Sequence, residues 1–114
     1  MKLEGEQKLL RIFVEEQDQW HGLPLHEAIV KEALSLGMAG ATVIKGFLGF
    51  GRKAHLHTTK LLELSEDLPI VIEIVDSAAQ IQKLLPRLDE MVREGLVTLE
   101  DVHVVIYRTH GDHP

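Results

Sequence analysis

Hydrophobic and polar positions alternate along residues 9–15, which predicts a β-strand with one side turned toward a core. Leu10, Ile12 and Val14 fall on the same side of this strand, because successive side chains of an extended chain point to opposite faces. A second strand is expected over residues 41–48. These two predicted strands mark the beginning and the end of the first structural half of the chain.

Between these strands the apolar spacing changes to that of a helix. Residues 17–23 are expected to form a loop, and Pro24 suits the first turn of a helix, where a missing N–H costs nothing. Gly37 can close the helix in a left-handed conformation. The apolar stripe of this predicted helix comprises Leu25, Ala28, Ile29, Ala33 and Leu36.

The same order repeats in the second half of the chain. Residues 70–75 (IVIEIV) predict a strongly β-branched strand. Ser77 suits the N-cap of a second helix, and Gln80, three residues later, completes a capping-box pattern. Pro86 lies inside this predicted helix, where it should bend the helix or remove one backbone hydrogen bond, and Gly95 is expected to end the helix. The apolar stripe comprises Ile81, Leu84, Leu85, Leu88, Met91 and Val92.

A final strand is expected over residues 102–108, so the order strand–helix–strand occurs twice. Two right-handed crossovers of this kind predict an α+β, ferredoxin-like βαβ-βαβ sandwich, in which a four-stranded antiparallel sheet carries two helices on one face. The opposite face would carry residues such as Val71 and Val75, or Val105 and Tyr107, which are too apolar for exposure. We therefore expect an oligomer that buries this face.

The connection between the second and third strands, residues 49–68, is far longer than the ~2–5 residues usual between neighbouring strands. A loop of this length is typically functional or disordered. It begins in the stretch GFLGFGRKAHLH, which combines glycines with basic residues and histidines. The stretch contains no GK[ST] and no GxGxxG pattern, so it is neither a Walker loop nor a dinucleotide fingerprint. Taken alone, these glycines are typical of a bulge or turn.

Three blocks of the sequence resemble the PII-like signalling proteins, and among them the branch catalogued as domain of unknown function 190. The blocks are PLHEAIVKEALSLGMAGATVIKGFLGFG, HLHTTKLLELSEDLPIVIEIVDS and EGLVTLEDVHVV. The resemblance extends from about residue 9 to residue 108 and keeps the blocks in order. It implies a single PII-like domain over residues 1–114, with a signalling loop at about residues 49–68 and a flexible tail at about residues 109–114.

The resemblance also implies a homotrimer whose sheets pack around a central axis. It implies that adenine nucleotides bind in clefts between subunits at the base of the loop. Binding would order the loop and control docking of a partner protein, such as a membrane transporter or channel. Glycines let backbone N–H groups approach phosphate oxygens, and arginines offer charge-assisted hydrogen bonds. The expected nucleotide-binding residues are Thr42, Lys45, Gly46, Gly49, Phe50, Gly51, Arg52 and Arg108.

One departure from the PII pattern concerns the phosphates. PII proteins carry a glycine- and lysine-rich loop between the second helix and the last strand. Here that connection, residues 93–101 (REGLVTLED), holds one glycine and a net negative charge. We therefore expect AMP or ADP rather than ATP as the ligand. The uridylylated tyrosine of enterobacterial PII also lacks a counterpart, because the only tyrosine, Tyr107, falls on the predicted last strand.

Composition narrows the remaining function classes. The formal net charge of −6 argues against a nucleic-acid binder, which needs a basic face. No apolar run approaches the ~20 residues of a membrane helix, so we expect no insertion into a membrane. The N-terminus lacks a signal-peptide core, and the chain has no cysteine, so a cytoplasmic location is expected.

Two other functions remain open. His55 and His57 lie two residues apart and share one side of an extended chain, so a metal-responsive trimer resembling the copper-tolerance proteins is one alternative. Those proteins usually use sulfur ligands, which are scarce here. The other alternative is an accessory module that binds a partner protein and no small ligand. No nucleophile–base pair or paired carboxylates indicate catalysis, so we do not expect an enzyme.

Overall fold

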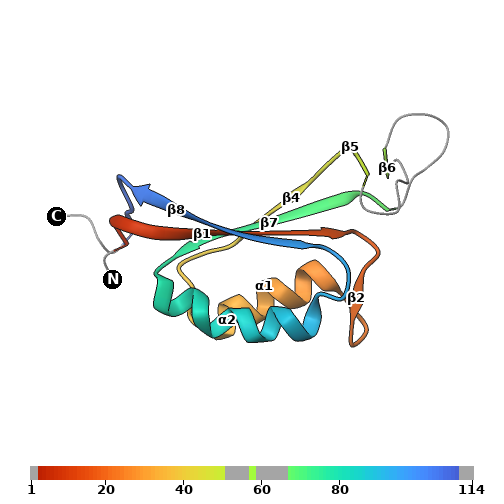
Figure 1. Ribbon diagram of the computed structural model, residues 1–114, viewed down its shortest axis with the longest axis horizontal. Helices are drawn as coiled ribbons and strands as arrows, with labels where there is room; N and C mark the ends of the chain where they lie inside the picture. The colour runs from red at the N-terminus through yellow and green to blue at the C-terminus, as the bar shows by residue number, and fades with distance from the viewer. Residues whose placement is uncertain (1–2, 51–56, 59–66, 111–114) are drawn as a thin grey trace.

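A four-stranded antiparallel sheet with two helices on one face forms the fold (Figure 1). The structure, a computed structural model, describes residues 3–50, 57–58 and 67–110. The strand order is β4-β7-β1-β8, as expected for a ferredoxin-like sandwich, so the predicted fold class is confirmed. The strands of the main sheet are β1 (Gly5–Glu15), β4 (Thr42–Lys45), β7 (Pro69–Asp76) and β8 (Leu96–Val104), and the helices are α1 (Leu25–Ser35) and α2 (Ala78–Met91).

Two short hairpins complete the described structure. One joins β2 (Gln19–Trp20) to β3 (Leu23–Pro24) between β1 and α1, and it includes Pro24, which was expected in the first turn of the helix and is its N-cap instead. The other joins β5 (Leu48–Gly49) to β6 (His57–Thr58) within the long connection between β4 and β7.

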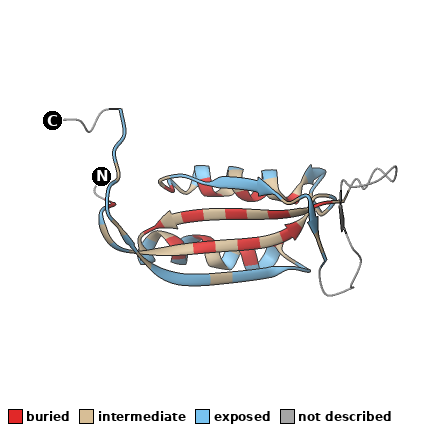
Figure 2. Ribbon diagram, turned by 90° about the horizontal axis from the view of Figure 1, so that it is seen from above, coloured by how far each residue is buried: buried red, intermediate tan, exposed pale blue. Residues whose placement is uncertain are grey.

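The core lies between the sheet and the helices. Along the two central strands, buried residues alternate with partly exposed ones (Figure 2), as the period of two predicted. Burying these aliphatic side chains is the main favourable contribution to folding. The buried core comprises Leu10, Ile12 and Val14 of β1, Ile70, Ile72 and Ile74 of β7, and residues of both helices that include Leu25, Ile29, Ala33, Ile81, Leu84, Leu88 and Met91.

The end of α1 and the start of α2 lie at the residues that the sequence indicated, whereas α2 ends at Met91, four residues before the expected Gly95. Gly37 follows α1 with a φ of 77°, a left-handed conformation that favours glycine. The Ser77 hydroxyl accepts a hydrogen bond from the Gln80 backbone N–H at 3.2 Å, so Ser77 is the N-cap of α2. The Gln80 side chain does not complete a capping box. Its Nε2 instead donates to the carbonyls of Leu36 and Gly37, each at 3.1 Å, and so holds the end of α1 against the start of α2.

A fully buried carboxylate joins the same two regions. Asp76, at the end of β7, accepts hydrogen bonds from the backbone N–H of Ala39 at 2.8 Å and of Ser77 at 2.7 Å. Buried charge is tolerated only with partners of this kind. Asp76 therefore fixes the segment that leads into β4.

The last strand lies earlier in the chain than the sequence predicted. A strand was expected over residues 102–108, but β8 runs from Leu96 to Val104 and pairs with β1 from Phe13 to Gly5. The prediction was wrong because β8 is an edge strand, whose exposed residues lack a clear period of two. Val105 and Tyr107 lie beyond the strand, so they are not part of the open sheet face.

The second strand is shorter than the expected residues 41–48. Pairing with β7 ends at Lys45, and the chain forms β5 only after Gly46 and Phe47. The Gly46 N–H donates to the Pro69 carbonyl at 2.7 Å, which keeps the chain beside β7 at this interruption.

The sheet face opposite the helices is largely apolar, with a charged cluster at its centre. Cross-strand pairing assigns to it Leu9, Phe13, Ile44, Val71, Val75 and Leu96. At the centre, Arg11 Nε donates to Glu73 at 2.9 Å, and Arg11 also pairs with Glu100. The hydrogen bond to Glu73 is the largest of the effects that raise the pKa of Arg11. Hereafter this surface is the open face.

Gly95 is expected to be indispensable for stability. Its φ is 150°, and a Cβ there would lie 2.5 Å from the Phe13 carbonyl oxygen. Gly95→Ala should lower the free energy of unfolding by about 2–4 kcal/mol, through backbone strain and overpacking. Urea unfolding measures the change.

Gly40→Ala is the matched control, because a Cβ at Gly40 meets nothing within 4 Å. It should change stability by no more than about 0.5 kcal/mol. Equal effects of the two substitutions would contradict the packing role of Gly95.

Candidate functional site

The candidate site lies at the end of the sheet where β4 leaves it and β7 enters it. Lys45 pairs with Ile70, which pairs with Val14 near the end of β1. Leu96, the first residue of β8, pairs with Phe13 at the same end. The base of the long loop and the connection from α2 to β8 therefore share one end of the sheet, on the right in Figure 1.

Two glycines bring the loop base against Pro69. A Cβ on Gly46 would lie 2.8 Å from Pro69 Cγ, and a Cβ on Gly49 would lie 3.2 Å from the same atom. Real Cβ atoms essentially never come as close as the first of these distances. Close packing against Pro69 therefore requires glycine at residue 46.

The loop base exposes a cluster of large apolar side chains. Phe47 is 74% exposed, Leu48 is 52% exposed and Phe50 is 71% exposed. Solvent-exposed aromatic residues so close together are typical of a surface that binds a ligand or another protein. Of these, only Phe50 was expected as a site residue, although the apolar residues between Gly46 and Gly51 were a signal for Phe47 and Leu48 as well.

Glu16 is a site residue that sequence reasoning missed. Its Oε2 lies 2.5 Å from Lys45 Nζ, in a partly exposed ion pair. The sequence separation of these residues hides the contact, because only the antiparallel arrangement of β1, β7 and β4 brings them together. The loop base therefore contains a Lys–Glu pair as well as the predicted lysine.

The remaining predicted site residues are spread over the molecule. Thr42 pairs with Glu73 on the open face, so its side chain and that of Lys45 lie on opposite faces of β4. Arg108 follows β8, whose last residue pairs with Gly5, whereas Lys45 is level with Val14. The two levels are about 30 Å apart along the sheet. Within one chain, Arg108 and Lys45 therefore do not meet.

Several predicted residues lie outside the described part of the chain. These are Gly51, Arg52 and His55; for His57, only the backbone is described, as a partner of Gly49 in the β5–β6 hairpin. Over residues 3–50, 67–110 and the two residues of β6, no group of three or more His, Cys, Asp and Glu residues could hold a metal ion. Over the same residues, no helix is long and apolar enough to cross a membrane.

The connection from α2 to β8 is shorter than predicted and is packed against the sheet. β8 begins at Leu96, so only residues 92–95 join the two elements. Gly95 lies directly against the Phe13 carbonyl and the Val92 side chain. Its lack of a Cβ is therefore used for close packing within the chain, and it does not form an open phosphate cradle.

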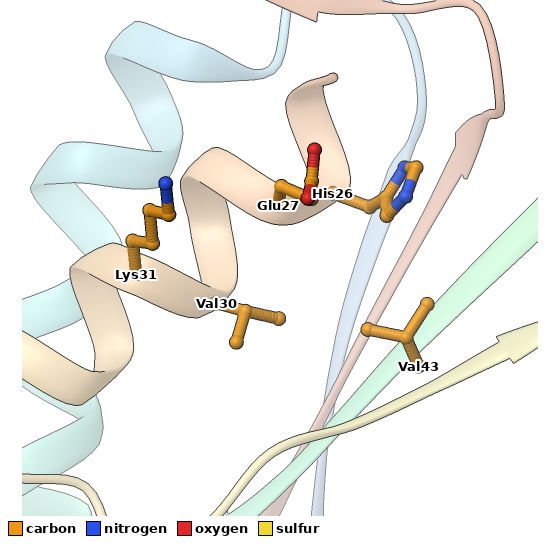
Figure 3. Close-up of a pocket in the computed structure, with 5 residues that line it drawn as sticks. All are labelled: His26, Glu27, Val30, Lys31 and Val43. Atoms are coloured by element: carbon orange, nitrogen blue, oxygen red, sulfur yellow. The ribbon is translucent and has the colours of Figure 1, made fainter. Parts of the chain in front are cut away.

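A groove beside the loop base opens between α1 and β4 (Figure 3). It has a volume of about 240 Å³ and is lined by His26, Glu27, Val30, Lys31 and Val43. Pockets that enclose drug-sized ligands usually measure about 300–1,000 Å³. The groove in one chain is thus too small and too open to enclose a nucleotide by itself.

A family model matches residues 7–104, which is most of the chain. The family is DUF190, described as "Uncharacterized ACR". The chain belongs to this family. One DUF190 relative, a UPF0166 protein from Aquifex aeolicus, is 37% identical over 98 residues, which are 86% of this chain and 92% of that protein. The resemblance of the sequence to the family catalogued as domain of unknown function 190 is therefore confirmed.

The DUF190 chain is also similar in structure to PII-like proteins. A putative PII-like signaling protein from Thermus thermophilus has a TM-score of 0.65 and 23% identity, with 89% of this chain and 91% of that chain covered. CPII from Thiomonas intermedia, a nitrogen regulatory PII-like protein bound to ADP, AMP and bicarbonate, has a TM-score of 0.59 and 20% identity, with 87% and 94% covered. At these identities the similarity establishes a PII-like fold.

The contact between Gly46 and Pro69 can be tested with a double-mutant cycle. Gly46→Ala should destabilise the chain by about 1–3 kcal/mol, because its Cβ would overlap Pro69 Cγ. In the Pro69→Ala background, which lacks that atom, the same change should cost less by at least about 0.5 kcal/mol. Thermal and urea unfolding of all four proteins give the coupling energy, and additive effects would contradict the contact.

Proposed function

We propose that this DUF190 protein is a PII-like signalling protein that binds an adenine nucleotide at the base of its long loop. Binding there would change the loop and so control which partner protein docks. The observation that carries the proposal is the loop base itself. It combines Lys45, two glycines and exposed phenylalanines at one end of a PII-like sheet. That CPII, with the same fold, is bound to ADP and AMP supports the choice of nucleotide.

We favour AMP or ADP over ATP because few groups are available for a triphosphate. The connection from α2 to β8, the position of the phosphate-binding loop in PII proteins, consists of residues 92–95. Its glycine is committed to contact with Phe13, and Arg93 and Glu94 together leave it without the net positive charge of a phosphate-binding loop. The basic residues at the loop base suffice for a shorter phosphate chain.

We infer that the site is completed by a neighbouring subunit in a homotrimer. Arg108 follows the end of β8 that is level with Gly5, about 30 Å along the sheet from the level of Lys45, so one nucleotide contacts both only if they come from different chains. The apolar open face gives a physical reason for assembly, since exposed patches of this kind are usually buried against another subunit. The resemblance to PII proteins implies the same assembly.

The remaining parts of the proposal follow from the resemblance and from composition. We expect a regulatory protein of the cytoplasm that has no catalytic role and does not bind nucleic acid. Its partner would be a protein such as a membrane transporter or channel. The exposed Phe47, Leu48 and Phe50 would contribute apolar contact area to that docking.

Titration calorimetry with AMP, ADP, ATP and cyclic dinucleotides tests the nucleotide site. We expect AMP or ADP to bind more tightly than ATP. Arg52→Ala should weaken binding roughly tenfold or more, because a charge-assisted hydrogen bond is lost. Lys83→Ala, which removes the same charge from an exposed position on α2, is the control. If none of the ligands binds, the nucleotide proposal is wrong and the fold is unaffected.

Assembly is tested separately by light scattering after gel filtration. Val71→Asp introduces a carboxylate on the open face, so the trimer should dissociate. Leu34→Asp makes a comparable change on α1, where Leu34 is 76% exposed, and should leave the trimer intact. A trimer that survives Val71→Asp would contradict burial of the open face.

A further inference from the structure

The turn after β1 contacts both segments at the base of the long loop, namely the end of β4 and the residues that lead into β7. The Glu16 N–H donates to the Leu68 carbonyl at 2.8 Å, and the Gln17 N–H donates to Asp67 Oδ1 at 3.1 Å. Within the turn, the Glu15 N–H donates to Asp18 Oδ2 at 2.9 Å. These bonds fix the backbone of Glu16 beside the point where the chain enters β7.

From this fixed position the Glu16 side chain reaches the other segment of the loop base. Its carboxylate lies 2.5 Å from Lys45 Nζ, at the end of β4. The Glu16 side chain is 27% exposed and the Lys45 side chain is 52% exposed. Lys45 is therefore accessible to a ligand, but its charge is already balanced by a carboxylate whose backbone is held in place.

This arrangement acts differently on ligands of different charge. A phosphate that approaches Lys45 also approaches Glu16, and the repulsion increases with each negative charge on the ligand. AMP carries about two negative charges at neutral pH and ATP about four, as expected from the pKa values of phosphate groups. A fixed carboxylate therefore disfavours ATP more strongly than AMP.

We propose that Glu16, through its ion pair with Lys45, determines the phosphate-chain selectivity of the loop-base site, admitting a nucleoside monophosphate more readily than a triphosphate. This inference rests on the proposed nucleotide function and adds the residue that sets the ligand class. Glu16 is a specificity residue that opposes phosphate charge, whereas Lys45 attracts it.

The experiment measures dissociation constants for AMP, ADP and ATP with the full chain and its Glu16→Gln variant. Glutamine keeps the size of the side chain and removes its charge. The ratio of the ATP to the AMP dissociation constant should fall roughly fivefold to tenfold in the variant, with ADP intermediate. The effect should shrink at high salt, because the pair is partly exposed. Thermal melts verify that the variant is folded.

Glu32→Gln is the matched control, since it removes the same charge and breaks the partly exposed Arg87–Glu32 ion pair. That pair joins α1 to α2 and involves neither end of the sheet, so the ATP-to-AMP ratio should not change. Lys45→Gln should weaken the binding of all three nucleotides, which would show that their phosphates lie near Lys45.

The outcomes separate this inference from the function on which it rests. If the unmodified protein binds nucleotides but Glu16→Gln leaves the ratio unchanged, or Glu32→Gln shifts it equally, the role of Glu16 is wrong and the function stands. If the unmodified protein binds no nucleotide, the proposed function fails and this inference fails with it.

Discussion

The antiparallel pairing of β1 with both β7 and β8 is the constraint on which the rest of the structure depends. β1 is a central strand, hydrogen-bonded on both sides, and it supplies Leu10 and Ile12 to the core with no exposure to solvent. Its register with the two neighbours sets which side chains face the helices. A slip by one residue would turn that strand's apolar set to the open face.

The same register assembles the candidate site. Because β7 begins level with the end of β1, Pro69 lies against Gly46, and the turn after β1 lies beside Lys45. Because β8 begins level with Phe13, the connection from α2 reaches the same end. The loop base is thus held by the hydrogen-bonded ends of β1 and β7, although the chain that it carries continues into the long connection between β4 and β7.

The two faces of the sheet have different roles. One is covered by α1 and α2 and forms the core. The other remains apolar around Arg11, whose guanidinium is held between Glu73 and Glu100. Paired charges within an apolar surface favour one packing geometry over others, since a misaligned copy would leave them unmatched. The open face therefore fits assembly with other subunits better than permanent exposure.

The sequence by itself determined the elements in which one side is buried along the whole length and so leaves a regular hydrophobic pattern. The alternation in β1 and β7, the apolar stripes of both helices, Gly37 and the Ser77 cap were all readable, because each depends on near neighbours in the chain. The long loop and the lysine and glycines at its base were readable as well.

Only the tertiary structure decided the rest. The limits of β8 follow from hydrogen bonds to β1, because an edge strand carries too weak a pattern to mark its own ends. The capping role of Gln80 at α1 and the pairing of Glu16 with Lys45 join residues far apart in sequence. Whether a glycine serves a ligand or a close contact depends on the atom opposite its missing Cβ, and only the folded chain supplies that atom.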